Sequence, residues 1–124
     1  IFWDYLKGDA AASACLSWHL AEAPEREKIG KCNRFYLQQP QKLTLTIEGA
    51  DEISEISGSS EQIAGWQSTV YGAKNPITSL LCRYNGPLPH EFTTIISHGD
   101  AVSANTELSV QVLELIDKLK KQIV

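Results

Sequence analysis

The sequence contains no methionine, only three cysteines and only three histidines, so several kinds of site have few side chains to draw on. Cys15, Cys32 and Cys82 are widely spaced and odd in number. A zinc site favours CxxC pairs, and a disulfide framework favours an even number of cysteines. We therefore expect three buried, unreactive thiols, with one disulfide and one free thiol as the alternative.

Positive charge is also scarce. Eleven lysines and arginines face 15 aspartates and glutamates, which gives a net charge of −4. Nucleic acids and anionic lipids attract clustered lysines and arginines, so this balance argues against both as partners. No apolar run approaches the roughly 20 residues of a membrane span. We expect neither a nucleic-acid partner nor a membrane partner.

The first residues do not have the pattern of a signal peptide. The chain opens inside an apolar run, Ile1-Phe2-Trp3-Asp4-Tyr5-Leu6, with no initiator methionine and no basic segment of the kind that begins a signal peptide. Such a start suggests a fragment or a processed piece of a longer protein. The length of 124 residues corresponds to one domain.

Alternation of apolar and polar residues dominates the first 97 residues. In 42–48 every odd position is aliphatic, and in 12–20 the even positions Ala14, Leu16, Trp18 and Leu20 share one face. The polar segment 21–32 contains a proline and a glycine and is expected to be a loop. Expected strands are 1–6, 12–20, 33–38, 42–48, 52–57, 77–84 and 91–97. This pattern predicts an all-β fold, an antiparallel β-sandwich or curved sheet.

The C-terminal segment has a different period. An apolar stripe at helical spacing predicts one amphipathic α-helix from about Thr106 to the end. The stripe consists of Leu108, Val112, Leu115, Ile116, Leu119 and Ile123. An alternative remains, because Leu108, Val110 and Val112 also alternate as in a strand. We expect a β-sandwich domain in 1–97, followed by a linker and the helix in 98–124.

Catalytic signatures are missing. No GxSxG, P-loop, HExxH or dinucleotide fingerprint occurs, and His19, His90 and His98 have no metal-ligand spacing. We therefore expect no catalytic residue, no metal ligand and no cofactor in these 124 residues.

An aromatic turn lies at residues 65–74. Trp66 and Tyr71 flank hydroxyl side chains that include Ser68, and Lys74 follows. An aromatic face can stack on the C–H surface of a sugar, while hydroxyls and a cation bind its polar groups. These four residues are the candidate substrate-binding site. The alternative is structural: Trp66 is a core residue that closes the end of the sandwich, and Tyr71 bonds back to the backbone.

The same stretch resembles the C-terminal end of heparinase II/III-type polysaccharide lyases. Those proteins carry a pattern similar to G-W-x-S-x-x-Y-G, then a strand, then a small residue followed by L-P-x-x-F-x-T-x-I. The matching residues are Gly65, Trp66, Ser68, Tyr71, Gly72, Gly86, Leu88, Pro89, Phe92, Thr94 and Ile96. Upstream, 2–8 and 17–21 resemble two further segments of that family, although the proline after the second one is displaced here to Pro24.

The resemblance covers about residues 1–97 and implies a parent protein with an N-terminal α/α toroid and a larger β-sandwich. Such lyases cleave uronic-acid polysaccharides by β-elimination, in which a base removes the C5 proton and an acid protonates the leaving oxygen. Their catalytic and metal-ligating positions lie upstream of this chain, and none maps onto it. The resemblance thus implies a structural part without its own active site, whose partners are the upstream catalytic domains and, through them, an acidic polysaccharide. It also implies a bacterial periplasmic or extracellular location.

Two other functions stay open. One is a carbohydrate-binding or adhesive β module that uses the aromatic turn 65–74. The other is a purely structural or oligomerisation element, with the apolar stripe of the terminal helix as its docking surface.

Overall fold

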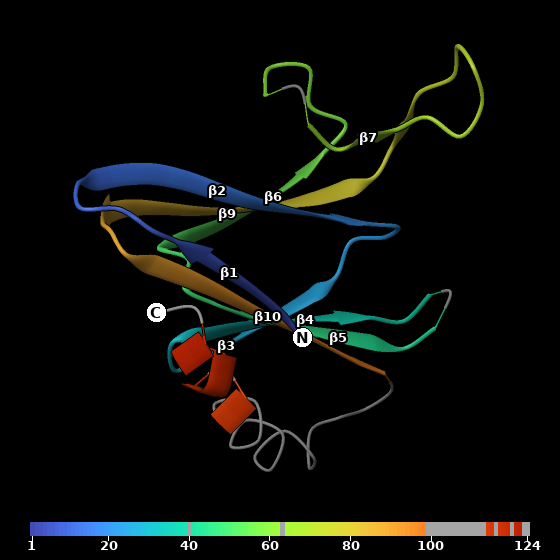
Figure 1. Cartoon of the computed structure of the whole chain (residues 1–124). Helices are drawn as coiled ribbons and strands as arrows, with labels where there is room; N and C mark the ends of the chain where they lie inside the picture. The colour runs from blue at the N-terminus through green and yellow to red at the C-terminus, as the bar shows by residue number, and fades with distance from the viewer. Residues whose placement is uncertain (40, 63, 99–113, 116, 120, 123–124) are drawn as a thin grey trace.

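β-Strands are the main element of the computed structural model, which describes residues 1–39, 41–62, 64–98, 114–115, 117–119 and 121–122 (Figure 1). The strands are β1 (Phe2–Leu6), β2 (Ala11–Leu20), β3 (Glu25–Ile29), β4 (Cys32–Leu37), β5 (Leu43–Glu48), β6 (Glu52–Ser57), β7 (Trp66–Gln67), β8 (Asn75–Pro76), β9 (Thr78–Pro87) and β10 (His90–His98).

Two antiparallel sheets lie one above the other (Figure 1). The larger has five strands in the order β1-β10-β5-β4-β3, and the smaller has three in the order β2-β9-β6. Strands β7 and β8 form a separate short ribbon that extends beyond the smaller sheet. The expected all-β antiparallel fold is confirmed.

The core lies between the facing sides of the two sheets. Phe35, Leu80 and Cys82 are fully buried there. The alternation seen in the sequence explains this, since every second side chain of a strand points to the same face. In β2 the even positions are more buried than the odd ones along the whole strand, as expected. One polar contact crosses the core: Trp18 Nε1 donates to the buried hydroxyl oxygen of Thr94, at 3.3 Å.

The prediction of a loop at 21–32 is wrong. This segment contains β3, which pairs with β4 through a two-residue turn at Gly30 and Lys31, and Cys32 already belongs to β4. Gly30 has a φ of +58°, which hairpin turns of this length require. Strand β3 is an edge strand and all five of its residues are exposed. It therefore shows no alternation from which a strand could be predicted.

The expected end of β9 is also wrong. Asn85-Gly86-Pro87 looks like a strand terminator, yet β9 continues to Pro87 and pairs with the beginning of β2. Proline lacks a backbone N–H and is tolerated at the end of a strand. The next strand, β10, ends at His98, one residue past the expected boundary of the β domain.

The described C-terminal residues, 114–115, 117–119 and 121–122, are helical as expected. Glu114, Asp117, Lys118 and Lys121 are exposed, and Leu119 of the apolar stripe is half-buried, whereas Leu115 is exposed. The expected start of the helix at Thr106, and the alternative strand near 108–112, fall outside the described residues. No helix within the described residues is long and apolar enough to cross a membrane.

The expectation of three buried thiols is wrong for two of the cysteines. All three are free, but only Cys82 is buried; Cys32 is half-buried and Cys15 is exposed. Cys15 pairs with Arg83 across β2 and β9, on the outward side of the smaller sheet. Leu16 and Cys82 form the next pair, on the inward side.

These environments predict an order of thiol reactivity. Burial raises the pKa of Cys82 from 9.0 to about 12, and burial together with the Glu48 carboxylate raises the pKa of Cys32. Because the thiolate is the reactive form, an alkylating reagent at mildly alkaline pH should modify Cys15 first, Cys32 more slowly and Cys82 only after unfolding. Mass spectrometry after timed quenching measures this order. Labelling of folded Cys82 as fast as Cys15 would contradict it.

The buried Cys82 thiol makes the free energy of unfolding depend on pH. The unfolded chain releases the Cys82 proton near pH 9.0, whereas the folded chain holds it until about pH 12. The contribution of Cys82 to the free energy of unfolding is therefore complete below the pKa of the unfolded chain. It is lost as the pH rises through the pKa of Cys82 in the folded chain.

Candidate functional site

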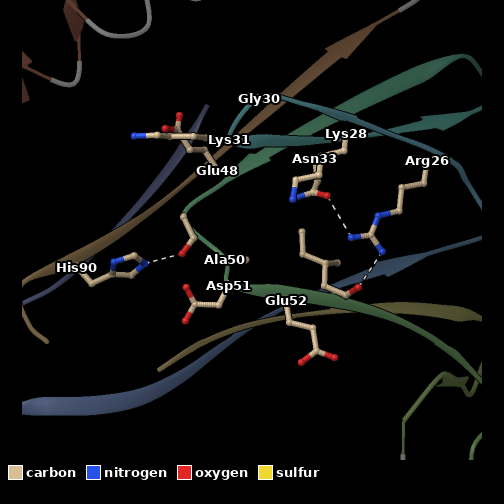
Figure 2. A pocket seen from close by; sticks show the side chains of 12 residues that line it. Arg26, Lys28, Gly30, Lys31, Asn33, Glu48, Ala50, Asp51, Glu52 and His90 are labelled. Carbon is tan, nitrogen blue, oxygen red and sulfur yellow. Dashed lines mark hydrogen bonds between the residues drawn. The ribbon is translucent and has the colours of Figure 1, made fainter. Parts of the chain in front are cut away.

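A cleft of about 560 Å³ opens where the hairpin between β3 and β4 faces the turn between β5 and β6 (Figure 2). It lies at one end of the space between the two sheets. Its lining consists of Arg26, Lys28, Gly30, Lys31, Asn33, Glu48, Gly49, Ala50, Asp51, Glu52, Ile53 and His90.

Arg26 connects the two sheets at this cleft (Figure 2). Its Nη1 donates to the carbonyl oxygen of Ile53 at 2.8 Å, and its Nη2 donates to Asn33 Oδ1 at 3.1 Å. The guanidinium carbon lies 5.4 Å from the centre of the Phe35 ring, within cation–π range. Arg26 belongs to β3 of the larger sheet and Ile53 to β6 of the smaller one. The guanidinium group is therefore held in place from three directions.

His90 makes a second connection. Its Nε2 donates to the carbonyl oxygen of Gly49 at 2.6 Å, which places the proton of the neutral ring on Nε2. The ring stacks on Tyr84 with centroids 3.4 Å apart, and Phe92 contacts it edge-on. Tyr84 belongs to the smaller sheet and His90 to the larger one. This histidine is thus fixed between the sheets, and its Nε2 is occupied.

The charges of the cleft are mixed. Three cationic side chains come from the β3–β4 hairpin, and three carboxylates come from the end of β5, the following turn and the beginning of β6. Asp51 Oδ2 accepts the backbone N–H of Asn85 at 2.9 Å, so it also holds β9. Among the described residues, no serine, threonine or cysteine lines this cleft beside His90. The arrangement can bind a small polar ligand through both donors and acceptors.

The aromatic turn brings two of its four predicted site residues together. Lys74 Nζ lies 4.0 Å from the centre of the Trp66 ring, and Trp66 Nε1 donates to the carbonyl oxygen of Ser59 at 3.1 Å. Strands β7 and β8 place them, because Trp66 pairs with Pro76. Trp66 is half-buried and also lines a smaller pocket of about 380 Å³ that His19 and Ile77 share. It is not a core residue, so the structural alternative is wrong on this point.

The other two predicted residues lie apart from this pair. Ser68 Oγ donates to the carbonyl oxygen of Val70 at 2.9 Å, within its own turn. Tyr71 is fully exposed at the tip of the loop, and Val70 beside it is 65% exposed. Within the described residues the Tyr71 hydroxyl has no hydrogen-bond partner, so the expected bond back to the backbone is not formed.

The three histidines occupy separate places. His19 shares a 2.8 Å hydrogen bond with the buried Ser79 hydroxyl, and His98 Nε2 donates to Gln41 Oε1 at 3.2 Å. His90 lies in the cleft. Among the described residues, no group of three histidine, cysteine, aspartate or glutamate side chains is placed to hold a metal ion.

Sequence reasoning missed the cleft because its cations lie in the segment that was expected to be a loop. One signal was available there. Arg26 and Lys28 are two positions apart, so in a strand they share a face, and both line the cleft. The contact between Arg26 and Ile53 joins residues from two different sheets, and no local pattern indicates it.

Comparisons with known proteins leave the family open: no family model, no curated protein and no solved structure matches the chain. The resemblance to heparinase II/III-type lyases is carried by the residues of the sequence pattern alone.

Proposed function

We propose that this chain is the C-terminal β-sandwich part of a heparinase II/III-like polysaccharide lyase and has no active site of its own. Its role is to complete and support the larger β-sandwich of the parent protein. One observation carries the proposal. Gly65, the first residue of the family-like pattern, lies at the crossing point of the long loop between β6 and β9, where the two ends of the loop bond to the same carbonyl group.

The carbonyl oxygen of Gly65 accepts two backbone N–H groups, from Gly58 at 2.9 Å and from Ile77 at 2.8 Å. These donors stand at the beginning and the end of the excursion that joins β6 to β9. Gly65 has a φ of +78°, and a Cβ at this position would lie 2.6 Å from the Ile56 carbonyl oxygen. The glycine at the start of the pattern is therefore required by the conformation of the loop. A pattern that preserves a loop conformation is expected in a structural part of an enzyme.

The neighbouring pattern residue has a similar role. The indole of Trp66 closes the loop through the Ser59 carbonyl, and its six-membered ring lies beside Gly58, where the nearest ring carbon is 3.6 Å from an added Cβ. Lys74 covers one face of the ring. These contacts favour a structural role over a catalytic one for the pattern as a whole.

The chemistry of the parent follows from the proposal. The base and the acid of the β-elimination belong to the upstream domains, and the substrate is an acidic, uronate-containing polysaccharide. A periplasmic or extracellular location belongs to the same proposal.

The coding sequence upstream of Ile1 tests this origin. We expect an open reading frame that continues upstream into a long helical region, as an α/α toroid requires, followed by further β-strands. A frame that begins close to Ile1, with no helical region before it, would sink the proposal.

A second function is favoured by one observation, the complete exposure of Tyr71 at the tip of the aromatic turn. An exposed aromatic ring is free to stack on a sugar, and Lys74 supplies a cation within the same loop. In this alternative the chain is a carbohydrate-binding module.

A titration separates the two functions. If the loop binds glycan, Tyr71→Ala should weaken the binding of alginate, heparin or heparan sulfate roughly 2- to 12-fold, since aromatic contacts contribute about 0.5–1.5 kcal/mol. Tyr71→Phe keeps the ring and should bind as the wild type does. Calorimetry measures the affinities, and thermal unfolding checks that both variants remain folded. Equal affinities for wild type and Tyr71→Ala, or no binding at all, would exclude this alternative.

A further inference from the structure

The two larger sheets end in four edge strands, and these edges differ in charge. An edge strand presents unpaired backbone N–H and C=O groups, and natural proteins protect such edges with charged side chains, proline or bulges. Asp4 lies in β1, four charged residues lie in β3, and Glu52 and Glu55 lie in β6. Strand β2, Ala11–Leu20, contains no aspartate, glutamate, lysine, arginine or proline.

Strand β2 is also long and regular. Its ten residues pair with β9 without interruption, from Ala11 opposite Pro87 to Leu20 opposite Thr78, so no bulge distorts it. Within the described residues, β9 is its only partner strand. The outward positions Ala11, Ser13, Cys15, Ser17 and His19 are all exposed, and four of these side chains are small. None of the protections found on the other three edges is present.

We propose that β2 is a self-association edge, on which a second copy of this chain adds its own β2 in antiparallel orientation. An uncharged antiparallel edge is its own complement under two-fold symmetry, because each N–H and C=O of one strand meets its counterpart on the other. The product is a continuous six-stranded sheet in the order β6-β9-β2-β2-β9-β6. This inference needs only the strand order and the residues of β2. In the parent protein proposed above, the upstream β-strands would then have to join a different edge.

The faces of the sheet limit the register of this pairing. Residues directly opposite each other in an antiparallel pair lie on the same face, so outward residues must meet outward residues. With the two-fold axis at the middle of the strand, Cys15 lies opposite either Cys15 or Ser17 of the second copy. The first register brings two exposed thiols within disulfide range, since opposed Cα atoms are about 4.5–5.5 Å apart.

The first test measures the oligomeric state of the full 124-residue chain. Sedimentation under reducing conditions should show a monomer–dimer equilibrium with a micromolar dissociation constant. Mild oxidation should then cross-link the dimer through Cys15 in the first register, and through an introduced Ser17→Cys in the second. A chain that is monomeric at all accessible concentrations overturns the proposal, as does a dimer that cross-links only through Cys32.

A charged variant with a matched control tests the edge itself. Ser13→Lys combined with Ser17→Lys places like charges directly opposite each other in the first register and at diagonal positions in the second, and it should raise the dissociation constant about tenfold or more. Ser57→Lys combined with Ser60→Lys adds the same charge at exposed positions at the end of β6 and beyond it and should leave the dissociation constant unchanged. Circular dichroism confirms that both variants are folded. A dimer weakened equally by both pairs, or only by the β6 pair, would place the interface elsewhere and overturn the proposal.

Discussion

Replacing Gly65 by alanine is expected to lower the free energy of unfolding by about 3–5 kcal/mol. The φ of +78° disfavours any residue with a Cβ, and the added carbon would lie 2.6 Å from Gly58 N and 2.7 Å from Ser57 Cα. These are backbone atoms at the end of β6 and the beginning of the loop that follows it, so they cannot rotate away as a flexible side chain would. Urea unfolding followed by tryptophan fluorescence measures the loss.

Gly72 provides a matched control within the same family-like pattern. Its φ of +77° is nearly the same, but a Cβ there meets no atom within 4 Å. Gly72→Ala should therefore cost only the conformational strain, about 1–2 kcal/mol. The difference between the two variants isolates the steric part. Equal losses for both would show that Gly65 does not hold the crossing point of the loop.

Phe35→Ala is expected to destabilise the fold by about 3–5 kcal/mol, because it removes a large, fully buried ring from the core. The ring belongs to the same cluster as Leu45 and Leu80, and it lies beneath the guanidinium group of Arg26. Its loss therefore weakens the core and one connection between the sheets together. Thermal and urea unfolding of the same variant give the magnitude.

Tyr71→Ala is the control for this substitution, since it removes a ring of similar size from a fully exposed position. Its free energy of unfolding should stay within about 0.5 kcal/mol of the wild type. A Phe35→Ala variant as stable as Tyr71→Ala would mean that the inner faces of the sheets do not meet as described.

Strands with one buried face could be predicted from the sequence, and strands without one could not. In β2 and β4 burial alternates along the strand, and the apolar pattern shows it directly. Strand β3 is exposed on both sides at the sheet edge, so its charged residues resemble a loop. The fold class follows from the first kind of strand, whereas an edge strand with no buried face, such as β3, becomes apparent only from its pairing in three dimensions.

The two candidate sites also differ in how far the sequence could predict them. The aromatic turn is contiguous in the sequence, so it could be recognised, although the sequence did not reveal that Lys74 contacts Trp66 while Tyr71 stays free. The cleft at Arg26 is assembled from the β3–β4 hairpin, the β5–β6 turn and His90, which come together only when the two sheets face each other. Cys15 differs, because the alternation in 12–20 already places it on the face opposite Leu16 and Trp18, and its exposure follows from that pattern.

The most direct test of the central claim is an assay of this chain alone with alginate, heparin and heparan sulfate. The absorbance of the unsaturated uronate formed by β-elimination reports any cleavage. Because the base and the acid of the proposed reaction belong to the upstream domains, we expect no increase in absorbance above a buffer control. Product formation by the purified 124-residue chain, at a rate proportional to its concentration, would show instead that the chain has an active site of its own.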